Sequence, residues 1–266
     1  MKKYLVILLS VVLVLSLISC KEESSALTIR VGATPVPHAE LLELVKDELK
    51  EEGIVLEIVE FTDYVTPNIA LSDGDIDANF FQHLPYLNEF SAEHNLELSS
   101  IGTIHVEPLG LYSNDLKSID ELKDQAIIAI PSDSVNGGRA LILLENKGLI
   151  TLKEGAGLKA TEVDIINNPK QLIFKAVEAA QLSRILPDVD AAMINGNYAI
   201  EAGLSPVSDA LIIEGSESPY ANIVVVRTGE EESKSLVALI KALQSEKVKA
   251  FINAEYGGGV VDAFGE

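Results

Sequence analysis

Residues 27–33 read LTIRVGA, a run rich in β-branched and small residues that indicates a strand. Apolar residues at helical spacing follow from His38 to about Lys50, and a second strand is predicted at residues 54–61, which read IVLEIVEF. This succession of strand, helix and strand is typical of an α/β protein, in which helices cover the faces of a sheet.

The same alternation continues to the end of the chain. Helices are predicted at Val65–Leu71, Leu84–His94, Gly138–Lys147, Glu178–Leu186, Glu231–Leu243 and Lys247–Tyr256. Further strands are predicted at Leu109–Tyr112, Ala126–Ile130, Val163–Ile166, Ala191–Ile194 and Ile223–Arg227. Most of these strands are short and apolar throughout, so we expect them to be buried on both faces of a sheet.

Two extended stretches, Thr103–Leu111 and Glu214–Asn222, each hold one proline beside strand-like residues and are predicted to cross between lobes. Length alone permits one large domain or two smaller lobes. With these crossings, the first lobe would combine residues 27–107 with 215–266, and the second would hold residues 108–214. Lobes joined by paired crossings can close on a ligand by a hinge motion.

The N-terminus has the pattern of a secretory signal, with Lys2 and Lys3 before the apolar run Tyr4–Ile18. A transmembrane anchor is the alternative, but the run is short for one and ends just before Cys20, the only cysteine of the chain. The pattern resembles a lipobox, where the cysteine is acylated, by palmitate for example, and the chain is cut before it. We therefore predict a signal peptide at residues 1–19 and a lipidated tether at residues 20–26, which places the body outside the cytoplasm in the cell envelope or periplasm.

The formal net charge is −21, and it becomes more negative once Lys2 and Lys3 leave with the signal peptide. So large an acidic excess argues against binding to nucleic acid or to a polyanionic substrate. An acidic, solvated surface is also what keeps many extracytoplasmic proteins soluble. The charge therefore excludes some partners and selects none.

The common catalytic signatures are absent from the sequence: it has no nucleophile elbow, no phosphate-binding loop and no zinc-protease motif. The four histidines, His38, His83, His94 and His105, lack the spacings of a local metal clip. We therefore expect neither an enzyme nor a bound metal or other cofactor. A metal-importer receptor stays open as an alternative.

Aromatic residues are only 5% of the chain, yet they gather in residues 75–86, which read DIDANFFQHLPY. In an extended segment the neighbours Phe80 and Phe81 point to opposite faces, one into the core and one toward a cleft. His83 and Tyr86 follow directly. Ordinary core aromatics beside a helix start are the alternative to a binding surface.

Polar residues with the chemistry to bind an amino acid stand at the ends of predicted strands. Arg139 follows a strand and the loop 131–138, where α/β sheets form binding crevices and where its planar fork would suit a carboxylate. It could instead pair with a surface carboxylate. Asn195 and Asn197 follow another strand and offer donors and acceptors, although asparagine is also common in turns. Asn222 lies on the second predicted crossing.

Several short stretches, taken in order, give the chain a resemblance to a known family. They are VGATPVPH at 31–38, DYVTPN at 63–68, GDIDAN from 74 through Tyr86, EPLGLY at 107–112, NPK at 168–170, AQL at 180–182, NGNY at 195–198 and SPYAN at 218–222. The chain resembles the methionine-binding lipoproteins (NlpA-type) of ABC importers from the lipobox nearly to Phe264.

The resemblance implies an α/β, two-lobed periplasmic-binding-protein fold (type II-like) with the ligand in the interlobe cleft. It implies a monomeric lipoprotein that binds L-methionine and delivers it to an ABC permease and its ATPase. Family members also bind D-methionine or methionine-containing dipeptides, and the quoted stretches do not separate these ligands. A surface lipoprotein with an adhesion or antigen role is a further alternative.

Matching the family pattern residue by residue gives eight candidate ligand-binding positions. They are Tyr64, Phe81, His83, Tyr86, Glu107, Arg139, Asn195 and Asn222. Phe81 and the tyrosines would enclose the thioether, which favours contacts with aromatic rings. Arg139 would clamp the carboxylate, and the two asparagines would bond to the α-amino and carboxylate groups. Glu107 is a candidate counter-charge for the ammonium group or for Arg139.

Overall fold

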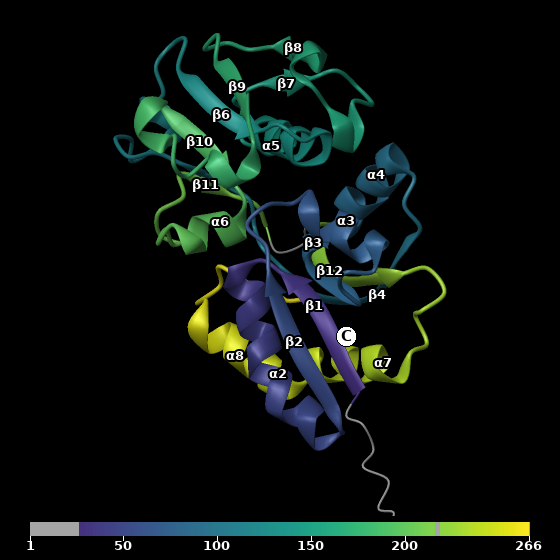
Figure 1. Cartoon of the computed structure of the whole chain (residues 1–266). Coiled ribbons are helices and arrows are strands. Elements are labelled where there is room, and N and C mark those ends of the chain that lie inside the picture. The colour runs from purple at the N-terminus through teal and green to yellow at the C-terminus, as the bar shows by residue number, and fades with distance from the viewer. Residues whose placement is uncertain (1–26, 216–218, 266) are drawn as a thin grey trace, which may run out of the picture.

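The protein is described here from a computed structural model, which covers residues 27–215 and 219–265 (Figure 1). The predicted signal peptide and Cys20 lie outside the described residues. Within them, no helix is long and apolar enough to cross a membrane. The elements form two lobes, each built on its own β-sheet, as the sequence predicts.

The first lobe contains a six-stranded sheet with the order β13-β4-β12-β3-β1-β2. Its strands are β1 (Leu27–Ala33), β2 (Ile54–Glu60), β3 (Ala78–His83), β4 (Leu98–Val106), β12 (Ala221–Arg227) and β13 (Val261–Asp262). Strands β2, β1 and β3 are parallel, and β12 pairs antiparallel with both β3 and β4. Segments from both ends of the chain therefore share one sheet.

Helices cover both faces of this sheet (Figure 1). They are α2 (Glu40–Glu51), α3 (Thr66–Asp73), α4 (Leu84–His94), α7 (Lys234–Leu243) and α8 (Glu246–Glu255), and the short π-helical turn η1 (Pro35–Ala39) precedes α2. The stretch 223–226 of β12 is apolar because its side chains are buried on both faces of the sheet. Val224 and Val226 face the core beneath α2, α7 and α8, whereas Ile223 and Val225 face the core beneath α3 and α4.

The second lobe contains a five-stranded sheet with the order β11-β5-β10-β6-β9. Its strands are β5 (Gly110–Tyr112), β6 (Ile127–Pro131), β9 (Ile173–Val177), β10 (Ala191–Ile194) and β11 (Ile212–Ile213). The long helix α5 (Ser134–Asn146) packs on one face, and the short helix α6 (Gly196–Glu201) packs on the other. Helix α6 also reaches the junction with the first lobe (Figure 1).

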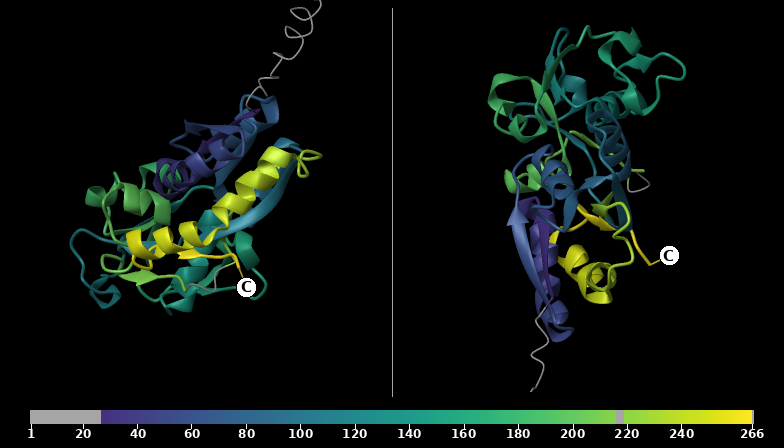
Figure 2. Two further views of the ribbon diagram at one scale, coloured as in Figure 1. Left: turned by 90° about the horizontal axis from the view of Figure 1, so that it is seen from below. Right: turned by 45° about the vertical axis from the view of Figure 1, so that its right-hand side comes forward.

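Two connections join the sheets. Residues 107–109 lead from β4 to β5, and residues 214–220, of which 216–218 are not described, lead from β11 back to β12. Strand β1 begins at the end of the first lobe that points away from the second lobe (Figure 1, Figure 2). The start of the described chain is therefore far from the junction of the lobes.

The predicted helix Glu178–Leu186 is wrong. The segment forms two 3-10 turns, η5 (Ala179–Gln181) and η6 (Leu186–Asp188), instead of an α-helix. Leu182 and Leu186 are buried at helical spacing, which is why the pattern indicates a helix. Pro187 disfavours the helical conformation at the residue before it and supplies no backbone N–H, so the chain tightens into short turns.

The predicted strand Val163–Ile166 is confirmed only in its second half, and the expectation that it is buried is wrong. Its first half lies in the 3-10 turn η4 (Glu162–Asp164), where the side chain of Asp164 accepts hydrogen bonds from the backbone N–H and the hydroxyl of Thr161. Its second half belongs to β8 (Ile165–Asn167), which pairs only with β7 (Thr151–Leu152). Val163 is 89% exposed and Ile166 is 68% exposed, so their apolar character does not report core positions.

Helix α5 begins four residues before the predicted start at Gly138, because Asp133 caps it by accepting a hydrogen bond from the backbone N–H of Asn136 at 2.8 Å. Arg139 therefore lies in the second turn of the helix. A Cβ on Gly138 would stand 2.3 Å from the backbone oxygen of Leu158, so this glycine permits close packing of α5 against the turn η3 (Gly157–Lys159).

We expect Gly138→Ala to lower the free energy of unfolding by about 1–3 kcal/mol, because the added methyl group must displace backbone. Urea unfolding followed by circular dichroism measures this change. Gly215→Ala is the matched control, since no atom of the described residues lies within 4 Å of its Cβ position. It should change the stability by less than about 0.5 kcal/mol. Equal effects of the two substitutions would contradict the packing argument.

Candidate functional site

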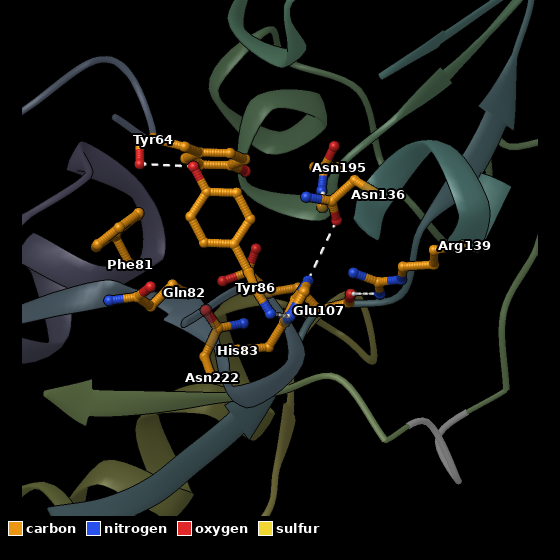
Figure 3. A pocket seen from close by; sticks show the side chains of 11 residues that line it. Tyr64, Phe81, Gln82, His83, Tyr86, Glu107, Asn136, Arg139, Asn195 and Asn222 are labelled. Carbon is orange, nitrogen blue, oxygen red and sulfur yellow. Dashed lines mark hydrogen bonds between the residues drawn. The ribbon is translucent and has the colours of Figure 1, made fainter. Parts of the chain in front are cut away.

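A cavity lies between the lobes and is lined by side chains from both (Figure 3). The structure brings together all eight residues proposed from the sequence: Tyr64, Phe81, His83, Tyr86, Glu107, Arg139, Asn195 and Asn222. Gln82, Asn136 and Gly196 complete the lining. The space that admits the centre of a water molecule is about 20 Å³, so the cavity is nearly closed. That volume suits about one water molecule.

The first lobe supplies an aromatic wall. Phe80 is fully buried in the core of the sheet and Phe81 faces the cavity, so the predicted opposition of these neighbours is confirmed. The ring centroid of Tyr64 lies 5.9 Å from that of Phe81 and 6.0 Å from that of Tyr86. The hydroxyl of Tyr86 donates a hydrogen bond to the backbone oxygen of Tyr64, which fixes the loop against α4.

His83 ends β3 and caps α4. Its Nδ1 accepts a hydrogen bond from the backbone N–H of Tyr86, so the proton of the neutral ring is on Nε2. This Nε2 donates to Oδ1 of Asn136 on α5 at 3.2 Å and so links the two lobes. Burial, followed by the nearby positive charge of Arg139, lowers the pKa of His83 to about 3. The ring is therefore neutral at physiological pH.

Arg139 is 3% exposed and makes an ion pair that the sequence does not reveal. Its Nε and Nη2 donate to the two carboxylate oxygens of Glu214 at 2.8 and 2.5 Å, and Nη2 also donates to the backbone oxygen of Glu107. The guanidinium carbon lies over the ring of Tyr220, 4.2 Å from the ring centroid. Arg139 thus lines the cavity and also pairs with a carboxylate. The side chain of that partner, Glu214, is only 12% exposed, so it is not the surface carboxylate of the alternative prediction.

A buried hydrogen-bond network surrounds Glu107. His105 Nε2 donates to Oε1 at 2.7 Å, and His38 Nε2 stands 3.2 Å from the same atom. The backbone N–H of Asn197, in the first turn of α6, donates to Oε2 at 2.8 Å. His38 Nε2 also lies 3.2 Å from Oδ1 of Asn222. One carboxylate thus connects β4, η1 and α6.

Burial determines the protonation of this network. It lowers the pKa of His38 to about 4 and that of His105 to about 3. Burial raises the pKa of Glu107, against the opposing effects of His38, the Asn197 N–H and Arg139. A neutral histidine can donate a hydrogen bond through Nε2, and a carboxylate oxygen can accept it.

The atoms of His38, His105 and Glu107 that could bind a metal ion lie within 4.8 Å of one another. Among the described residues, this is the one group of three or more such side chains. The sequence did not reveal it, because η1 and β4 are remote in the chain and adjacent only in the folded sheet. In the described arrangement these atoms already have partners: His105 Nε2 donates to Glu107, and His38 Nε2 lies 3.2 Å from both Glu107 Oε1 and Asn222 Oδ1.

Two buried side-chain atoms next to the cavity lack hydrogen-bond partners in the described part of the chain: Asn195 Oδ1 and Asn197 Nδ2. Asn195 donates through Nδ2 to Oδ1 of Asn136, and Asn197 accepts the hydroxyl of Tyr64 through Oδ1. A buried polar atom without a partner costs about 1–3 kcal/mol. Asn195, which lines the cavity, therefore offers an acceptor to a bound molecule.

The cavity residues missed from the sequence have little signal of their own. Asn136 lies in the loop 131–138 that directs attention to Arg139, but nothing separates it from the other polar residues there. The position of Gly196 has no room for a side chain, because a Cβ there would stand 2.8 Å from the Cβ of Glu107. Glu214 is one of 41 acidic residues, and only the fold brings it to Arg139.

Comparisons with known proteins agree with this arrangement. Residues 29–264 match the family model described as NlpA lipoprotein. The membrane lipoprotein TpN32 of Treponema pallidum is 46% identical over 234 residues, which cover 88% of this chain and 87% of that protein. The D-methionine-binding lipoprotein MetQ of Escherichia coli K12 is 40% identical over 251 residues, which cover 93% of each chain.

A solved structure supports the same relationship. A nutrient-binding protein of Burkholderia cenocepacia bound to methionine superposes with a TM-score of 0.86 at 44% sequence identity. The alignment covers 89% of this chain and all of that one. The similarity therefore extends over both lobes.

The buried histidines predict a stability that falls in acid. Their folded-state pKa values lie below the ordinary 6.5, so protonation favours the unfolded chain as the pH falls from about 6.5 toward 4. His105→Gln should reduce the slope of unfolding free energy against pH, between about pH 6 and 5, by roughly 1 kcal/mol per pH unit. Urea titrations of both proteins across this range measure the slopes.

The substitution can also lower the stability at neutral pH, but that effect shifts the whole curve and leaves the comparison of slopes intact. Identical slopes for the two proteins would mean that His105 binds its proton equally well in the folded and unfolded states. That result would contradict the burial argument.

Proposed function

The chain belongs to the NlpA lipoprotein family, and from that membership we propose that it is an extracytoplasmic lipoprotein that binds L-methionine and delivers it to an ABC importer. The observation that carries the proposal is the cavity between the lobes, in which an aromatic wall faces a polar one. The relatives reported above are named as lipoproteins or as binding proteins, in keeping with a receptor rather than an enzyme.

The aromatic wall suits the thioether end of the ligand. Phe81, Tyr64 and Tyr86 come from three adjacent segments of the first lobe and turn their rings toward one another (Figure 3). A polarizable sulfur gains about 0.3–1.5 kcal/mol from contact with an aromatic ring, beyond the burial of its methyl groups. Oxygen-rich or charged side chains would find no equivalent partners there.

The polar wall suits the zwitterionic end. Arg139 Nη1 makes no hydrogen bond with the described residues, so it is the part of the fork that can reach a carboxylate. The unpaired Oδ1 of Asn195 can accept from an ammonium group, and the amide of Asn222 lines the same space. In this proposal Glu107 acts mainly by holding α6, since His105 and the backbone N–H of Asn197 already donate to its two oxygens.

The described conformation is close to a closed one. Several hydrogen bonds cross between the lobes, among them those of His83 to Asn136, Tyr64 to Asn197, and Tyr198 to the backbone oxygen of Thr62. A space for about one water molecule is too small for an amino acid, so we infer that the lobes separate to admit the ligand. The two connections at residues 107–109 and 214–220 provide the hinge.

The remaining parts of the proposal follow from the family and the N-terminal sequence. Residues 1–19 act as a signal peptide, and Cys20 carries the lipid that ties the protein to a membrane. The lobes have the limits 27–107 with 215–266 and 108–214. The receptor works as a monomer and hands its ligand to a membrane permease driven by an ATPase.

Isothermal titration calorimetry on the chain from Lys21 onward tests the ligand, with the protein first unfolded and refolded to remove any ligand retained from the cell. We expect heat with L-methionine. Heat with D-methionine or a methionine-containing dipeptide alone would change the assigned ligand. No heat with any of the three would favour the alternative of a surface lipoprotein with an adhesion or antigen role.

In the same experiment Asn195→Ala should weaken the binding of L-methionine by about 1–3 kcal/mol, because it removes a partner of the ligand's polar end. Asn253→Ala is the matched control, since its amide bonds only to the backbone of its own helix, α8. An unchanged affinity for Asn195→Ala would remove this residue from the site.

The anchor is tested by Cys20→Ser in the full-length chain. Because the thiol is the site of acylation, we expect the variant to lose incorporation of labelled palmitate and to leave the membrane fraction when cells are fractionated. The wild-type chain should keep the label after detergent extraction. Label that persists in the variant would place the lipid elsewhere.

A further inference from the structure

Glu214 holds the guanidinium group of Arg139 from the side away from the ligand cavity. Its two oxygens accept from Nε and Nη2, and one of them also accepts the backbone N–H of Leu109 at 3.0 Å. The carboxylate therefore joins α5 to both connections between the lobes. It does not line the ligand cavity, although Arg139 does.

This pair occupies the edge of the guanidinium group that would otherwise bind a carboxylate through two parallel hydrogen bonds. Nε and Nη2 are committed to Glu214 and to the backbone oxygen of Glu107, and the ring of Tyr220 lies 4.2 Å from the guanidinium carbon. A ligand carboxylate can therefore meet Arg139 only through Nη1. The arginine is fixed in place and its charge is already balanced.

The other charges near the cavity do not restore a positive field. Burial keeps His38, His83 and His105 neutral at physiological pH. The remaining charged group in the lining besides Arg139 is the carboxyl group of Glu107. With Glu214 included, the groups at the cavity sum to no net positive charge. A monoanionic ligand would bring a buried negative charge without a counter-charge, which is unfavourable.

We propose that Glu214 determines which net charge of ligand the cavity accepts: by neutralising Arg139, it makes the binding of a carboxylate depend on a cationic group in the same ligand. This role rests on the proposed function, because it concerns the same cavity. It makes Glu214 a specificity-determining residue that does not touch the ligand and acts through Arg139. Free amino acids satisfy the requirement, and their deaminated analogues do not.

The test uses three compounds with the same thioether chain and different charge. L-methionine is a zwitterion, 4-(methylthio)butanoate lacks the amino group, and 3-(methylthio)propylamine lacks the carboxylate. Calorimetry measures L-methionine directly, and competition against it measures the weaker compounds. In Glu214→Gln, relative to L-methionine, the anion should gain at least about tenfold in affinity and the amine should lose by a similar factor, because a buried like charge disfavours the anion only in the wild type.

Two further variants separate charge from structure. Glu214→Asp keeps the charge and should keep the wild-type order of the three compounds, even if all bind more weakly. Glu230→Gln is the matched control, since Glu230 also pairs with an arginine, Arg227, at 2.9 Å but lies away from the cavity. It should leave the order and the affinities unchanged.

A uniform change of all three affinities in Glu214→Gln would overturn the proposal and leave Glu214 with a purely structural role. If that variant does not fold, the wild type still decides: binding of the anion as tight as that of the amine would overturn the proposal. Failure of the wild type to bind L-methionine at all would instead refute the proposed function. The two inferences can therefore fail separately.

Discussion

The carboxylate of Glu107 is the contact on which the arrangement of the cavity depends. It is 6% exposed, and it accepts hydrogen bonds from His105 on β4 and from the first turn of α6, with His38 of η1 3.2 Å away. A buried carboxylate is costly unless its oxygens are satisfied, so these segments must meet at one point. Because Glu107 also begins the first connection, it ties the position of α6 to the hinge.

The two walls of the cavity differ in their chemistry. Rings from β3, from α4 and from the loop before α3 form an apolar surface. Helix α5 and the start of α6 supply amides and a guanidinium group (Figure 3). The rings come from the first lobe, whereas Arg139 and Asn195 come from the second, so neither lobe can enclose a ligand alone. In the proposed function closure assembles the site, and a buried polar atom such as Asn195 Oδ1 gives a ligand a reason to stabilise the closed form.

Prediction from the sequence succeeded where a pattern was local. The helix Leu84–His94 and the strand Ala191–Ile194 have the predicted bounds, because each is defined by its own apolar residues and adjacent turn signals. It failed where tertiary context or proline overrode the pattern. The segment Glu178–Leu186 has helical spacing but ends at Pro187, and the apolar residues of Val163–Ile166 lie largely on the surface.

The sequence by itself determined the α/β class, the order of most strands and helices, and, through its resemblance to a family, eight of the eleven residues that line the cavity. These features depend on local periodicity or on motifs that can be read in order. Only the tertiary structure decided the Glu107 network and the pairing of Arg139 with Glu214. Their partners are far apart in the chain, and a single glutamate among many carries no sign of its partner until folding brings the two together.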